Sequence, residues 1–200
     1  MNAIDMLIQQ LDTVNIRLHH TAADLTPEEL VARPIRGVNP IGFILWHMAR
    51  SQDWAVNTAI RNEPEVITSG SWRQTQLAVP GTGTGFDAEE AESVAGRVDR
   101  ETLLAYSDAV HEQITSWLRK QSESMLDEIP DAEAHDAPYP EYQTDGFRAE
   151  MNSGPERDDA VGRKGGLPAW VYLTSVAVTH LHRHIGEVDL LKDVVRRGVS

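Results

Sequence analysis

Four segments of this sequence carry apolar residues at helical spacing, and no stretch alternates apolar and polar residues for long enough to form a convincing strand. The first segment places Ile4, Leu7, Leu11, Val14 and Leu18 at three- and four-residue steps, and therefore on one stripe. Helices that each carry one apolar stripe can bury those stripes against one another. The pattern therefore predicts an all-α fold, a four-helix bundle, in a single domain that spans residues 1–200.

The other three helices are predicted from their capping signals. Asn39 is a suitable N-cap for the second helix, with Pro40 as its first residue, because proline has no N–H to leave unpaired there. Asp87 and Glu90 form a capping-box pair at the start of the third helix, and Gly198 follows the end of the fourth. The predicted ranges are approximately 40–62, 87–117 and 168–197.

The connections between these helices differ in length. The first, residues 26–38, is short, and the second, residues 63–86, is rich in glycine and threonine. The third, residues 122–166, is long and contains four prolines; loops of this length in compact domains are usually functional lids or disordered segments. Such a link also permits a crossover before the last helix, so the third and fourth helices need not be neighbours.

Charge and composition narrow the possible functions. The chain has 18 basic and 31 acidic residues, a net charge of −13, and no basic stripe, so we expect no nucleic-acid partner. Because Asp5 interrupts the N-terminal apolar stretch and no run of 18 apolar residues occurs, we expect neither a signal peptide nor a membrane span, and a cytoplasmic location. There is no cysteine, so a metal must be held by nitrogen or oxygen and a thiol must come from outside.

The eight histidines separate according to their positions relative to the apolar stripes. His180 and His184 lie one turn apart on the core line of the fourth helix, so their rings can converge on one point. His47 lies in the middle of the apolar face of the second helix, whereas His182 is turned about 160° away from the pair. The others are interpreted as surface or hydrogen-bonded core residues: His19, His20, His111 and His135.

This arrangement favours the hypothesis of a three-histidine metal site. Three imidazoles from two helices can offer nitrogens to one ion at about 2.0–2.1 Å and leave a fourth position for water or substrate. Without a metal, three imidazoles buried together would leave lone pairs unpaired, or would repel one another once charged. The alternative is that each histidine is an ordinary core residue, because a single pair at this spacing also arises by chance.

Two stretches resemble the signatures of the DinB/YfiT-like superfamily. "IGFILWHMARSQDW" is similar to its second-helix signature, a Trp-His pair followed by Arg and an acidic residue. "HLHRHIGEVDLLKDVV" is similar to its last-helix signature, in which His-x-x-x-His precedes Gly and an apolar tail. The order of one early and two late histidines also agrees, whereas His182 and the long third connection depart from the family pattern.

The resemblance implies a four-helix bundle with a divalent ion, zinc or nickel, held by His47, His180 and His184. Characterised members of the family, which include mycothiol-dependent maleylpyruvate isomerase and bacillithiol transferases, use the metal to bind a low-molecular-weight thiol. The resemblance therefore implies an enzyme that transfers or isomerises a small-molecule substrate with such a thiol as cosubstrate. The alternatives are a metal-dependent hydrolase and a non-catalytic, stress-related bundle with a structural metal.

Two charged residues are candidates for roles beside the histidines. Arg50, one turn after His47, can pair with a substrate carboxylate, or can form an ion pair with Asp53 or Glu187. Glu187, one turn from His184, can orient that ring or serve as a fourth ligand. The apolar stripes of the first and third helices leave a homodimer possible, although core packing explains them as well.

Overall fold

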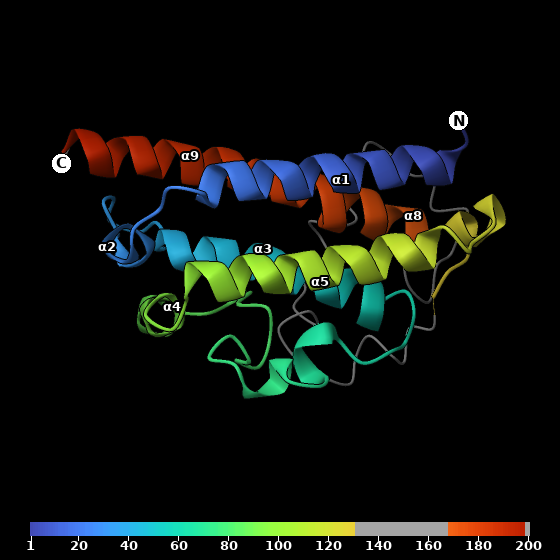
Figure 1. The fold of residues 1–200 in the computed structure, drawn as a ribbon, viewed down its shortest axis with the longest axis horizontal. Coiled ribbons are helices and arrows are strands. Elements are labelled where there is room, and N and C mark those ends of the chain that lie inside the picture. The colour runs from blue at the N-terminus through green and yellow to red at the C-terminus, as the bar shows by residue number, and fades with distance from the viewer. Residues whose placement is uncertain (131–167, 199–200) are drawn as a thin grey trace, which may run out of the picture.

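A computed structural model describes residues 1–130 and 168–198 of the chain, and every regular element in these two ranges is helical (Figure 1). The α-helices are α1 (Ala3–Ala22), α2 (Pro27–Val31), α3 (Ile41–Asp53), α4 (Ala88–Ala95), α5 (Arg100–Leu118), α8 (Ala169–Val171) and α9 (Leu181–Arg197). Two π-helical stretches, η1 (Trp54–Thr58) and η6 (Tyr172–His180), continue α3 and join α8 to α9. Short 3₁₀ turns occur at η2 (Val66–Thr68), η3 (Trp72–Gln74) and η4 (Glu123–Asp127).

The predicted four-helix bundle is present. Its four long rods are α1, α3 with η1, α5, and the continuous run of α8, η6 and α9. Both α1 and α3 contact α5 and α9, so α5 and α9 stand at opposite corners of the bundle. The third and fourth predicted helices are therefore not neighbours, and the connection before the last helix crosses between corners.

A second crossing lies in the connection between α3 and α5. Asp53 accepts a hydrogen bond from Tyr106, and four residues further along Asn57 donates one to Gln113, so α3–η1 and α5 run in the same direction. The chain must therefore return along the bundle between these rods, and residues 59–87 make this return (Figure 1). This return segment passes close to the histidines and supplies part of their surroundings.

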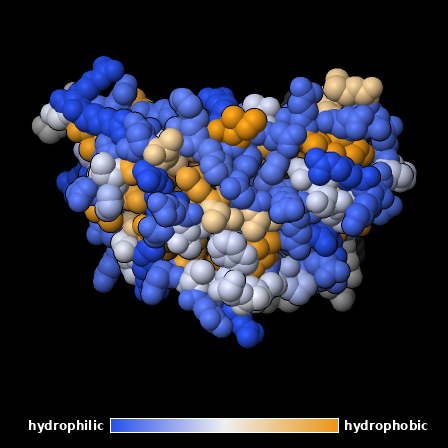
Figure 2. Space-filling view, viewed as in Figure 1, coloured by the Kyte–Doolittle hydropathy of each residue, from blue (hydrophilic) through white to orange (hydrophobic). Residues whose placement is uncertain are grey.

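The core forms where the predicted stripes meet. The α1 stripe is buried in full, together with Leu173, Ala177, Val188 and Leu191 of the last rod. This packing uses the α1 stripe within the chain, so the stripe itself is not available to a dimer, although Met6 and Ile16 on the same helix are exposed. On the face seen in Figure 2, hydrophobic residues appear in separate groups between hydrophilic ones.

The prediction of one continuous third helix was wrong, because this segment forms two helices. α4 ends at Ala95 and α5 begins at Arg100. Gly96 closes the first helix, and Asp99 caps the second by accepting a hydrogen bond from the Thr102 amide at 2.9 Å. Helical periodicity on both sides of the break concealed a second N-cap in the sequence.

Other boundaries also differ from the prediction. The first connection contains α2, whose N-cap Thr26 forms a capping box with Glu29. α3 begins at Ile41 after Pro40 and has no side-chain cap, so Asn39 does not play the predicted role. The predicted capping box of Asp87 is confirmed, and Gly198 ends α9 with a φ of 62° in the left-handed region.

Of the long third connection, residues 122–130 are described and include η4, whereas residues 131–167, with His135, lie outside the described residues. The amide of Ala169 donates to the carbonyl of Glu128 at 2.9 Å, which joins the two described ends of the connection. Across residues 1–130 and 168–198, no helix is both long enough and apolar enough to cross a bilayer.

Candidate metal centre

Three histidines from two neighbouring rods meet inside the bundle. His47 comes from α3, His180 is the last residue of η6, and His184 lies in the first turns of α9. The His180 Nε2 atom lies 3.3 Å from Nε2 of His47 and 2.9 Å from Nε2 of His184. One nitrogen from each ring falls within 4.8 Å of the others, and no further cluster of this kind occurs among the described residues.

The outer nitrogens of two rings are held by acceptors. Nδ1 of His47 donates to the carbonyl oxygen of Thr82 at 2.6 Å, and Nδ1 of His184 donates to the Glu187 carboxylate at 2.7 Å. Since these oxygens only accept, both Nδ1 atoms carry the proton, and the neutral rings turn an Nε2 lone pair inward. The predicted orienting contact between Glu187 and His184 is therefore present.

The inward nitrogens fit a divalent ion better than they fit one another. Two lone pairs face His180, whose single Nε2 proton can satisfy only one of them, and the buried Nδ1 of His180 has no partner among the described residues. Bonds of about 2.0–2.1 Å at tetrahedral angles separate two nitrogens by about 3.3 Å, which is close to the spacing here. The geometry suits a shared ion with little movement of the rings.

Burial keeps the rings of His47 and His180 uncharged near neutral pH. It lowers the pKa of His47 to about 4 and that of His180 to about 2, because an imidazolium would lose its hydration inside the bundle. The hydrogen bond from His184 lowers the pKa of Glu187, so that carboxylate stays ionised. The site therefore combines the neutral imidazoles of His47 and His180 with the Glu187 carboxylate, which accepts a hydrogen bond from the outer nitrogen of His184.

A cavity of about 510 Å³ opens beside the three rings. Its size is in the range of pockets that hold small molecules. Its apolar wall includes Phe43, Ile44, Phe86 and Val176, and its polar wall includes Arg183. Hydroxyl or amide groups come from Asn39, Ser51, Thr84, Ser175 and Thr179. The open side of the histidine cluster thus faces a space that admits a ligand.

A family model described as the DinB superfamily matches residues 10–188. The chain belongs to the DinB superfamily. A solved structure, described as the crystal structure of the conserved protein of locus from Enterococcus faecalis, has a similar fold, with a TM-score of 0.67 and 18% identity over 98% of each chain. No curated protein matches the chain.

In this DinB-superfamily protein, Arg50 does not line the histidine cavity. Its side chain is 1% exposed and donates twice to the carbonyl of Gly81, at 3.0 and 3.2 Å. It also pairs with Glu65 and lies 3.7 Å from Asp53, which itself accepts from Tyr106 at 2.6 Å. The predicted ion pair with Asp53 is confirmed, whereas a contact with a substrate carboxylate has no support in this geometry.

The return segment links this ion-pair network to the metal centre. Arg50 holds Gly81, and the next residue, Thr82, supplies the carbonyl that fixes the His47 tautomer. Trp46 anchors the same segment by donating to the carbonyl of Leu77 at 2.9 Å. Sequence analysis missed Thr82, because a backbone carbonyl leaves no mark on residue identity. The run "GTGTG" is a signal that could have been used, since clustered glycines often mark close backbone approach.

Gly83 shows how tightly this segment packs, and we predict a large cost for Gly83→Ala. Its φ is +92°, and a Cβ atom would lie 2.7 Å from the Phe43 ring and 2.8 Å from the Trp46 ring. Gly85 has a similar φ of +84° but nothing within 4 Å of a Cβ, so Gly85→Ala measures backbone strain alone. Urea unfolding should show Gly83→Ala to be less stable than Gly85→Ala by about 1–3 kcal/mol. Equal stability of the two variants would contradict this packing.

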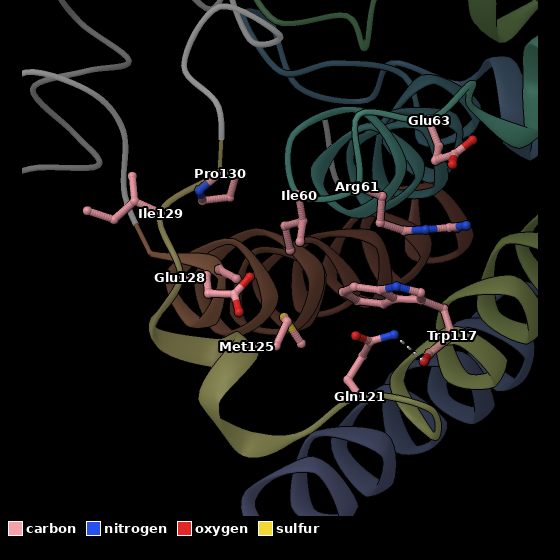
Figure 3. A pocket seen from close by; sticks show the side chains of 10 residues that line it. Ile60, Arg61, Glu63, Trp117, Gln121, Met125, Glu128, Ile129 and Pro130 are labelled. Carbon is pink, nitrogen blue, oxygen red and sulfur yellow. Dashed lines mark hydrogen bonds between the residues drawn. The ribbon is translucent and has the colours of Figure 1, made fainter.

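A second cavity, of about 350 Å³, lies at the end of α5 and shares no lining residue with the first. Figure 3 shows Arg61 above the ring of Trp117, and their separation is 5.6 Å from guanidinium carbon to ring centroid. Glu63 and Glu128 also line it, and its wall reaches Pro130, where the described range ends. None of its described lining residues is a histidine, and we assign no metal to it.

Proposed function

We propose that this protein is a metal-dependent enzyme that binds a low-molecular-weight thiol at the three-histidine centre and uses it in a transfer or isomerisation reaction. His47, His180 and His184 would hold the ion, zinc or nickel. Thr82 and Glu187 would keep two of the rings in the required tautomer. When bound, a divalent ion lowers the pKa of a thiol ligand and so favours the nucleophilic thiolate near neutral pH.

The observation that carries this proposal is the open side of the histidine cluster. Three inward nitrogens would leave the fourth coordination position of an ion open toward the cavity. Catalytic zinc sites keep such an open position, whereas structural zinc sites are closed by four protein ligands. Glu187 is engaged with Nδ1 of His184, which supports an orienting role over that of a fourth ligand. These contacts favour catalysis over a purely structural metal.

The lining of the cavity favours a thiol over water as the nucleophile. Metal-dependent hydrolases commonly place a carboxylate as general base beside the metal. None of the described residues that line this cavity is Asp or Glu, and the chain has no cysteine of its own. A thiol cosubstrate therefore fits the residues present more simply than hydrolysis does.

The proposal is tested with cobalt-reconstituted protein, because the visible absorption of cobalt reports its ligands. Mycothiol or bacillithiol is titrated into the wild type, the metal-free protein and His184→Ala. We expect a saturable change in the cobalt spectrum for the wild type alone. A metal-loaded protein that ignores both thiols but cleaves a nitrophenyl ester would instead establish the hydrolase. A loaded protein with neither property, whose melting temperature falls sharply on chelation, would establish a structural metal.

A further inference from the structure

We infer that the cavity beside the three histidines takes a small organic anion, and that Arg183 is the residue that selects it. The inference rests on the proposed function, because it names the ligand class of the same site. Its basis is the distribution of charge and polarity over the cavity wall, together with the position of Arg183 on the last rod.

The cavity wall carries positive charge in an acidic protein. Acidic residues outnumber basic ones by 31 to 18 in the chain, yet among the described residues of this wall there is no Asp or Glu. Arg183 is the one Lys or Arg among them. With an ion held by neutral imidazoles, the described part of the wall would present two positive centres and no acidic side chain, which attracts anions.

Arg183 lies close to the metal centre and beside neutral donors. It precedes His184 directly, and beyond the larger effect of burial its charge lowers the pKa of both His47 and His180. Ser175, Thr179 and Arg183 follow one another at four-residue steps, and all three line the cavity. Two hydroxyls and a guanidinium are suited to carboxylate oxygens.

The facing wall defines the rest of the ligand. Phe43 and Phe86 lie with their ring centroids 6.2 Å apart and both line the cavity with Ile44. Apolar side chains cannot satisfy a charged group, so they suit the hydrocarbon part of a ligand. The wall thus fits a molecule with an apolar or aromatic body and a carboxylate directed to Arg183.

A competing role for Arg183 is an ion pair within α9. Glu187 lies four residues later, and Arg183 contributes to the lowering of its pKa, after the larger effect of the His184 hydrogen bond. If Glu187 neutralised Arg183 in this way, anionic and neutral ligands of the same shape would bind alike. The experiment below separates the two roles.

The test uses para-mercaptobenzoate and its neutral counterpart para-mercaptobenzamide with cobalt-loaded protein. The rigid para arrangement prevents the carboxylate from reaching the ion that holds the sulfur. We expect the affinity ratio of acid to amide to be about tenfold higher for the wild type than for Arg183→Gln, as for one charge-assisted contact. Arg183→Lys should retain part of the preference. Arg197→Gln, on the same helix and paired with Asp193, is the matched control and should behave as the wild type.

Equal ratios for the wild type and Arg183→Gln, with unchanged circular dichroism and cobalt content, would overturn the inference. Failure of the proposed function is separable from this result. If neither thiol alters the cobalt spectrum, the same comparison is made with benzoate and benzamide, read as the rise in melting temperature of the protein. A rise with benzoate that Arg183→Gln abolishes supports the anion site without any thiol chemistry, whereas equal rises in both proteins exclude it.

Discussion

His184→Ala is expected to reduce the affinity of the protein for zinc or nickel by well over a hundredfold. The variant removes one of three inward nitrogens, and it also removes the ring that Glu187 holds in place. Loss of a hydrogen bond that orients a metal ligand lowers the metal affinity by about 10–100-fold. Loss of the ligand itself should lower the affinity further. The measurements are metal content after dialysis and a competition titration with a chromophoric chelator.

The same helix provides graded controls for this prediction. His182→Ala removes a histidine two residues away that is absent from the cluster, and should leave metal binding unchanged. Glu187→Gln keeps the ring but weakens its support, so the affinity should fall by about 10–100-fold. Without metal, His184→Ala should be at least as stable as the wild type, because it relieves the crowded lone pairs. Unchanged metal content in His184→Ala and His47→Ala would refute the metal centre.

Arg50→Met is expected to destabilise the protein by about 3–5 kcal/mol, because it removes the cation from a buried group of charges. Glu65 and Asp53 are 3% and 0% exposed, so their carboxylates cannot recover hydration in its place. Asp53 retains the hydrogen bonds from Tyr106 and from the amides of Val66 and Ile67, but Glu65 loses its ion pair with Arg50. Urea unfolding of the metal-free proteins measures the difference.

Arg33→Met is a close control for this substitution. Arg33 also bonds one backbone carbonyl, that of Val38, and one carboxylate, that of Glu92, both at 2.8 Å. It differs in keeping 26% of its side chain exposed, as surface pairs do. Such pairs contribute about 0–1 kcal/mol, so Arg33→Met should unfold near the wild type. Comparable losses in the two variants would show that burial does not set the importance of Arg50.

Local spacing was sufficient to predict the parts of this protein that depend on neighbours in the chain. His180 and His184 are one helical turn apart, and their convergence follows from helix geometry alone. His47 was placed by its position on an apolar stripe, and its meeting with the pair followed from the expectation of a bundle. The break at Gly96 was missed because a helix that ends and restarts within four residues keeps nearly the same periodicity.

Contacts between distant segments were beyond such reasoning. The sequence predicts Asp53, Glu187 or a substrate carboxylate as the partner of Arg50, because these lie within one turn or in the supposed site. Glu65 is fifteen residues away in an irregular connection. Thr82 acts on His47 through its main chain, so the identity of its side chain does not reveal this contact. Arg183 stood in the quoted motif, but only the cavity shows that it lines the wall beside the histidines.

The sequence separation of the three histidines has a consequence for how the protein matures in the cell. A full 133 residues separate His47 from His180. During translation the first imidazole therefore leaves the ribosome long before the other two, and the nascent chain cannot assemble the trio until its final rod is made. The proposed centre could therefore bind an ion with all three histidines only after the last rod is made, and fragments truncated before residue 180 should lack the metal affinity expected of it.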